Sequence, residues 1–107
     1  MSKFTIHDLE QRVHTRAKAS PEESYTRKLL DGGVAHCAKK LGEEAVEVSI
    51  AAIVEDRERL IAETADLLFH LLVVLEARGV TLAEVETELG ARQNQSGLDE
   101  KAARKNR

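Results

Sequence analysis

The sequence predicts an all-α protein, a compact helical bundle of about four to five helices built around an antiparallel helix pair and dimerising through helical faces. Three observations support this prediction. Ala, Leu, Glu, Arg and Lys dominate the composition, and all five favour helix. The only proline is Pro21, and apolar residues recur at helical spacing along most of the chain. At 107 residues the chain forms one small domain, and a core so poor in aromatic side chains gains from a second copy.

The first two predicted helices are short. Helical spacing places the first over residues 4–13, with apolar positions at Phe4, Ile6, Leu9 and Val13. Ser20 before Pro21, with Glu23 three residues later, resembles a capped helix start. Because the segment DGG soon stops the helix, we expect a short helix over about residues 24–30.

Two long helices follow and form the antiparallel pair. The first begins at residue 34, and we expect it to bury one apolar stripe of Val34, Ala38, Leu41, Ala45, Val48 and Ala52. The segment VEDR makes a tight connection, in which Asp56 is a candidate N-cap for the second long helix. That helix ends at Gly79, and Thr81 can cap a final helix through Leu89.

The composition also limits the partners and the compartment. Residues 1–90 are expected to form the domain, and residues 91–107 a mobile tail with a basic end, because the apolar pattern fails from Gly90 onward. The net charge of -3 argues against nucleic acid as the main partner. The apolar run from Leu67 to Leu75 is too short to cross a bilayer, so we expect no membrane partner. A single cysteine and a polar N-terminal segment indicate a cytoplasmic protein.

Four carboxylates are predicted to meet on the long helix pair. Glu44 and Glu47 lie three residues apart on one helix, and Glu63 and Asp66 repeat that spacing on the next. Counted from the connection, Glu47 stands nearly level with Glu63, and Glu44 with Asp66. Glu47 also lies in an apolar run, where a carboxylate needs a partner. Such a cluster repels itself unless a cation neutralises it, and Mg²⁺ suits a few carboxylates completed by water and substrate phosphates.

Two other interpretations of these acids remain open. Acidic pairs three residues apart are common on solvated helix faces and need not bind anything. A di-iron bundle also uses carboxylates, but it needs Glu-x-x-His motifs, and His70 follows Asp66 by four residues and Glu63 by seven. The pattern therefore favours Mg²⁺ over iron.

At these acids the chain closely resembles the phosphoribosyl-ATP pyrophosphohydrolase family of the all-α nucleotide pyrophosphohydrolases. The superfamily signature, E-x-x-E and then E-x-x-D, is present as EAVE and ETAD. The closer likeness lies in the segments SYTRKLLDGG, KKLGEEAVE, ERLIAETADLLFHLLVVLEARG and SGLDEKAARK. The resemblance implies Mg²⁺-dependent hydrolysis of phosphoribosyl-ATP to phosphoribosyl-AMP and pyrophosphate, the second step of L-histidine biosynthesis. It also implies a homodimer, and a separate cyclohydrolase is a candidate partner.

Specific roles follow for the residues that match. The predicted metal ligands are Glu44, Glu47, Glu63 and Asp66, and the predicted catalytic residues are Glu43, Glu44 and Glu47, with Glu43 as either the general base or a supporting group. Lys28 and Lys40 are candidates to hold substrate phosphates, although Lys40 is equally placed for an ion pair on its own helix.

Three further residues carry weaker expectations. His70 is either a partner of Asp66 or, more simply, a core histidine satisfied by a neighbour, and Cys37 is expected to be a small buried side chain. Gly42 costs about 1 kcal/mol against alanine within a helix and favours a close approach of substrate or of another helix.

Two alternative functions stay open beside the biosynthetic one. The first is a housecleaning pyrophosphohydrolase acting on free nucleoside triphosphates, which would share the same carboxylates. The second is a non-enzymatic helical dimer whose acidic cluster only binds metal.

Overall fold

The computed structural model describes residues 3–93 together with Lys101 and Arg104. These residues form five helices in chain order: α1 (Ile6–Arg16), α2 (Tyr25–Asp31), α3 (Val34–Val54), α4 (Arg57–Arg78) and α5 (Leu82–Arg92). The described ranges contain no strand, which confirms the all-α prediction. Most of the predicted tail lies outside the described residues, but α5 continues three residues past Leu89.

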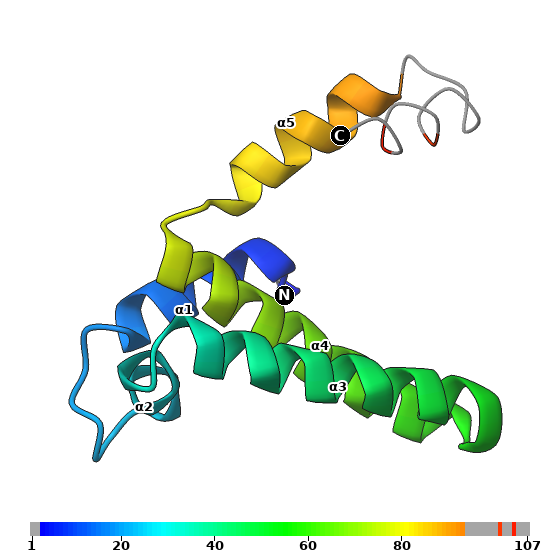
Figure 1. Cartoon of the computed structure of the whole chain (residues 1–107), viewed down its shortest axis with the longest axis horizontal. Helices are drawn as coiled ribbons and strands as arrows, with labels where there is room; N and C mark the ends of the chain where they lie inside the picture. The colour runs from blue at the N-terminus through cyan, green and yellow to red at the C-terminus, as the bar shows by residue number, and fades with distance from the viewer. Residues whose placement is uncertain (1–2, 94–100, 102–103, 105–107) are drawn as a thin grey trace.

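The long helices α3 and α4 lie side by side as an antiparallel hairpin and share the most extensive contact between elements (Figure 1). The helices α1 and α2 pack against one end of this hairpin, and α5 extends away from it (Figure 1). The buried core lies at the same end and consists of Val13, Leu29, Cys37, Leu72 and Val73. The other end, around the α3–α4 connection, is covered by no other helix of the described chain (Figure 1).

Local capping signals determine most helix ends. The Asp56 side chain accepts a hydrogen bond from the backbone N–H of Arg59, and the Thr81 side chain accepts one from Glu84, so both predicted N-caps are confirmed. Gly79 ends α4 with φ at 67°, a left-handed conformation that glycine adopts without strain. These ends turn α4 back along α3 and direct α5 away from the pair.

The capped start expected at Ser20 is wrong. Residues 21–23 form a turn, and Ser24 is the N-cap of α2, where its hydroxyl accepts a hydrogen bond from the Arg27 N–H. That hydroxyl also donates to the carbonyl of Arg16, which ties the end of α1 to the start of α2. Ser24 therefore caps α2 in place of Ser20, because Ser24 is buried between two helices whereas Ser20 is exposed.

The apolar stripe predicted for α3 is also wrong in most of its members. Val34, Ala38, Ala45 and Ala52 are exposed, and only Leu41 and Val48 are half-buried. The covered face instead contains Cys37, Leu41, Glu44, Val48 and Ala51. These positions alternate steps of four and three residues, the repeat by which a helix faces one antiparallel partner. Apolar residues lie on both sides of α3, so helical periodicity alone did not identify the side that meets α4.

Candidate metal centre

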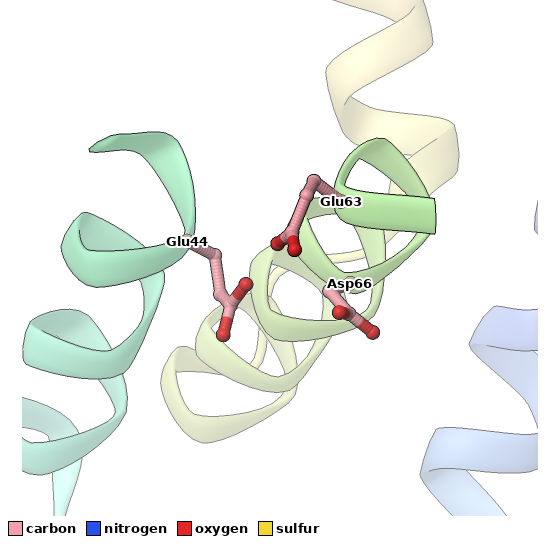
Figure 2. A group of neighbouring side chains, drawn as sticks. All are labelled: Glu44, Glu63 and Asp66. Carbon is pink, nitrogen blue, oxygen red and sulfur yellow. The ribbon is translucent and has the colours of Figure 1, made fainter. Parts of the chain in front are cut away.

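Three of the four predicted carboxylates converge midway along the hairpin. One oxygen each of Glu44, Glu63 and Asp66 lies within 4.8 Å of the other two. Figure 2 shows Glu44 reaching from α3 toward Glu63 on α4, with Asp66 one turn further along α4. Glu63 is buried, Glu44 is half-buried and Asp66 is exposed. The group therefore opens to solvent on the side of Asp66.

The helix pairing explains why these acids are held together. Glu44 occupies a position of the covered face of α3, between Leu41 and Val48. On α4, Glu63 is one of four buried residues, and Asp66 follows it by three positions on the neighbouring side of the helix. Packing of α3 against α4 thus places carboxylates at contact positions that apolar side chains usually occupy in a pair of packed helices. This packing brings three like charges together. Because they repel one another, a counterion is needed to stabilise the group.

One counterion is present within the chain. Arg59 lies one turn before Glu63 on α4, and its Nη2 is 2.9 Å from Oε1 of Glu63. The Glu63 side chain is 9% exposed and the Arg59 side chain 59% exposed, so the guanidinium approaches a nearly buried carboxylate from solvent. Sequence analysis missed Arg59, and the only available signal was its spacing of four residues from a predicted metal ligand.

Glu47 is placed differently from the other three acids. It is exposed on α3, one turn beyond Glu44, and does not belong to the group whose oxygens lie within 4.8 Å. Its apolar neighbours Val46 and Ile50 are exposed in the single chain as well. The expected apolar surroundings of Glu47 are therefore not provided by the described residues of one chain.

The remaining predicted site residues lie near the acids or on the surface. Glu43 is exposed, and one of its oxygens is 3.5 Å from the ammonium of Lys40, so the ion pair weighed for Lys40 is present. Lys40 is half-buried on the helix turn before Glu44. Lys28 is exposed in the last turn of α2. Of the two lysines, only Lys40 is thus close along the chain to the acidic group.

His70 continues the acidic face of α4 into the core. It is buried, and its Nδ1 donates a hydrogen bond to the backbone carbonyl of Asp66 at 2.9 Å. The other ring nitrogen, Nε2, is buried and finds no hydrogen-bond partner among the described residues. The ring packs edge-on against Phe69 and Tyr25. His70 is therefore a core histidine, as expected, but only one of its two nitrogens is satisfied.

The donor set suits a hard divalent cation. All three groups offer carboxylate oxygens, the ligands that Mg²⁺ and Ca²⁺ take, and opposite oxygens around such an ion lie roughly 4–5 Å apart. The three carboxylate oxygens lie within 4.8 Å of one another, close enough for all three to bind one such ion. No cysteine or histidine contributes to the group, which disfavours zinc and the softer transition metals.

Comparison with known proteins gives one consistent result. The model of the family described as phosphoribosyl-ATP pyrophosphohydrolase matches residues 6–93, which include all five helices. A protein of Bradyrhizobium diazoefficiens named phosphoribosyl-ATP pyrophosphatase 1 is 63% identical over 98% of this chain and 99% of its own length. One of Rhodopseudomonas palustris with the same name is 60% identical over 98% of both chains, and the phosphoribosyl-ATP pyrophosphatase of Rhizobium meliloti is 58% identical over 99% of both. The chain belongs to the phosphoribosyl-ATP pyrophosphohydrolase family.

Proposed function

We propose that this protein hydrolyses phosphoribosyl-ATP to phosphoribosyl-AMP and pyrophosphate, the second step of L-histidine biosynthesis. The observation that supports this most directly is the convergence of Glu44, Glu63 and Asp66 in a chain of that family. The substrate carries a triphosphate, and hydrolysis between its α and β phosphates needs positive charge beside the oxygens. An acidic group open on one side can supply that charge by holding a divalent cation.

The proposed metal ligands are Glu44, Glu63 and Asp66, with Glu47 as a fourth that reaches the ion from the solvent side of α3. Bound Mg²⁺ supplies neutralisation of the polyphosphate and activation of the attacking water. The chain itself fixes the positions of the acids through the α3–α4 packing. Glu43 is the proposed base, and it is exposed on the turn of α3 that carries Glu44, where it can accept a proton from water.

Cations beyond the metal are needed to hold a triphosphate. We assign this role to Lys40 and Lys28, as the sequence suggested. Lys40 is near the acids along α3, and its pair with Glu43 at 3.5 Å is loose enough to exchange for a phosphate oxygen. Lys28 lies on the exposed surface of α2 and is assigned on the family resemblance alone.

We also propose that two copies associate through the uncovered half of the hairpin. Val46, Ile50 and Ile53 form a stripe on the outer face of α3 and are 57%, 47% and 82% exposed. A side chain placed on Gly42, one turn before Val46, would meet nothing within 4 Å among the described residues, so this face is open to a close neighbour. A second copy with the same stripe would cover it.

Compartment and further partners rest on weaker grounds. In the part of the chain that the structure describes, no helix is long and apolar enough to span a membrane. A cytoplasmic location remains a proposal from the single free thiol of Cys37. A separate cyclohydrolase acting on the product remains a candidate partner.

A pyrophosphate-release assay tests the function. Phosphoribosyl-ATP and a panel of nucleoside triphosphates are each supplied with and without Mg²⁺, at equal substrate concentration. Turnover of phosphoribosyl-ATP alone, abolished by chelation, is the expected result. Preference for free nucleoside triphosphates would assign the housecleaning role instead, and metal binding without any turnover would leave only the non-enzymatic dimer.

A further inference from the structure

The ion pair between Arg59 and Glu63 joins a surface cation to the most buried acid of the metal centre. The Nη2–Oε1 distance of 2.9 Å is that of a charge-assisted hydrogen bond. Helix electrostatics alone does not account for it. A positive side chain in the first turn of α4 meets the positive end of the helix dipole, and an arginine four residues before a glutamate is the less favourable order of such a pair.

The acids of the centre do account for the pair. Glu63 is buried beside Glu44 and Asp66, and without a cation the three carboxylates repel one another. Among the ion pairs of the described residues, only the one formed by Arg59 involves an acid of this group. With Arg59 paired to Glu63, the metal-free group carries a formal charge of -2, and with a divalent cation in place of Arg59 it carries -1, so the cation neutralises the acids better than Arg59 does.

We propose that Arg59 is a resident counterion of the metal centre, which holds Glu63 in the metal-free protein and which the divalent cation displaces. This inference rests on the proposed metal site. A guanidinium hydrogen-bonded to a ligand lies within a few ångströms of the ion, and like charges at that distance repel. The side chain is 59% exposed, so it can rotate into water without disturbing the packing of α4. Arg59 therefore lowers the affinity for the cation while it stabilises the empty fold.

A matched pair of variants tests the role. Arg59→Gln removes the charge and keeps much of the side chain. Arg57→Gln removes the same charge from the same helix turn, on an exposed residue that makes no ion pair with the acids. Binding of Mg²⁺, and of Mn²⁺ as a spectroscopic probe, is measured by calorimetry and electron paramagnetic resonance without substrate. Melting temperatures of the metal-free proteins are measured at equal protein concentration.

The expected result is that Arg59→Gln binds Mg²⁺ about three- to fivefold more tightly than the parent, the upper part of the range that a partly exposed ion pair allows. Its metal-free form should melt at a lower temperature, and its stabilisation by Mg²⁺ should be larger. Arg57→Gln should match the parent within about twofold in affinity.

Two results overturn the inference in distinguishable ways. If Arg59→Gln binds Mg²⁺ as weakly as the parent, or more weakly, Arg59 orients Glu63 for the metal and does not compete with it, while the proposed metal site stands. If the parent binds neither Mg²⁺ nor Mn²⁺, both the counterion and the metal site are wrong. Metal binding is measured without substrate, so the comparison of the two variants still tests the role of Arg59 if the protein shows no turnover in the hydrolysis assay.

Discussion

Glu44→Gln separates a metal centre from a decorative acidic surface, because only the metal centre predicts a gain in metal-free stability together with a loss of activity, whereas a surface acid predicts little change in either. Glu44 is half-buried, faces Glu63 and Asp66, and makes no ion pair within the described residues. Glutamine keeps the size and shape of the side chain and removes only the charge. The metal-free variant should therefore be more stable than the parent, whereas activity should fall.

The magnitude follows from the spacing of the acids. Two unit charges at the 4.8 Å limit repel by about 1 kcal/mol in a water-like medium and by roughly 3 kcal/mol at an effective dielectric constant of 20. The lower figure applies, because Asp66 is exposed and Arg59 offsets part of the charge on Glu63. A gain of about 1 kcal/mol raises the melting temperature of a domain of this size by roughly 4–8 °C.

The assay is thermal unfolding in chelator and in Mg²⁺ at one fixed protein concentration, together with pyrophosphate release. Glu44→Gln should lose activity by more than about a hundredfold, since even groups that only support a metal ligand are worth ten- to a hundredfold. Its stabilisation by Mg²⁺ should be smaller than that of the parent.

Glu47→Gln is the matched comparison on the same helix. Glu47 is exposed and outside the close group, so its neutralisation should leave the metal-free free energy of unfolding within about 0.5 kcal/mol of the parent. Activity should still fall if Glu47 completes the site. A Glu44→Gln protein that melts several degrees lower in chelator, or that keeps parental turnover, would refute the reasoning.

Three other residues give independent tests. Ile53→Asp places a charge on the proposed dimer face. Sedimentation at micromolar concentration should therefore show a dimer for the parent and a monomer for the variant. A monomeric parent would contradict the proposed dimer. Burial raises the pKa of the Cys37 thiol, so less of the thiol is ionised near neutral pH. Alkylation by iodoacetamide should therefore be at least about tenfold slower in the native than in the denatured protein, and equal rates would contradict the burial of Cys37. His70→Phe removes the buried ring nitrogen Nε2, which has no hydrogen-bond partner within the part of the chain that the structure describes. A buried polar atom without a partner costs about 1–3 kcal/mol, so the melting temperature of the variant should stay level or rise, and a fall of several degrees would contradict this expectation.

Helix boundaries were predictable because their signals are local. Asp56, Gly79 and Thr81 each act on backbone groups within a few residues, through a side-chain acceptor or a left-handed backbone conformation. Ser20 failed although its signal had the same form. The hydroxyl of Ser24 also bonds the carbonyl of Arg16, and that contact between two helices depends on the tertiary structure.

The buried face of α3 was not predictable in the same way. Apolar residues cover both the face that meets α4 and the outer face that carries Val46, Ile50 and Ile53. Periodicity measures how apolar a face is, and it does not indicate whether α4 or a second copy covers that face. The convergence of the acids was easier to predict, since a short connection fixes which residues of two antiparallel helices lie level with each other along the pair. Height alone, however, did not show that Glu44 is half-buried in the close group while Glu47 is exposed and outside it.

The positions of the acids within the hairpin explain how the chain tolerates them. The hydrophobic core lies at the end where α1 and α2 pack, so Cys37, Leu72 and Val73 hold α3 against α4 without help from the centre. Along α4 the acidic group lies closer to the α3–α4 connection than Leu72 and Val73 do, outside the cluster of buried apolar residues. A destabilising cluster there weakens the part of the hairpin that Arg59, the proposed cation and the proposed second copy would each reinforce. The same cluster inside the core would have to be neutralised before the chain could fold.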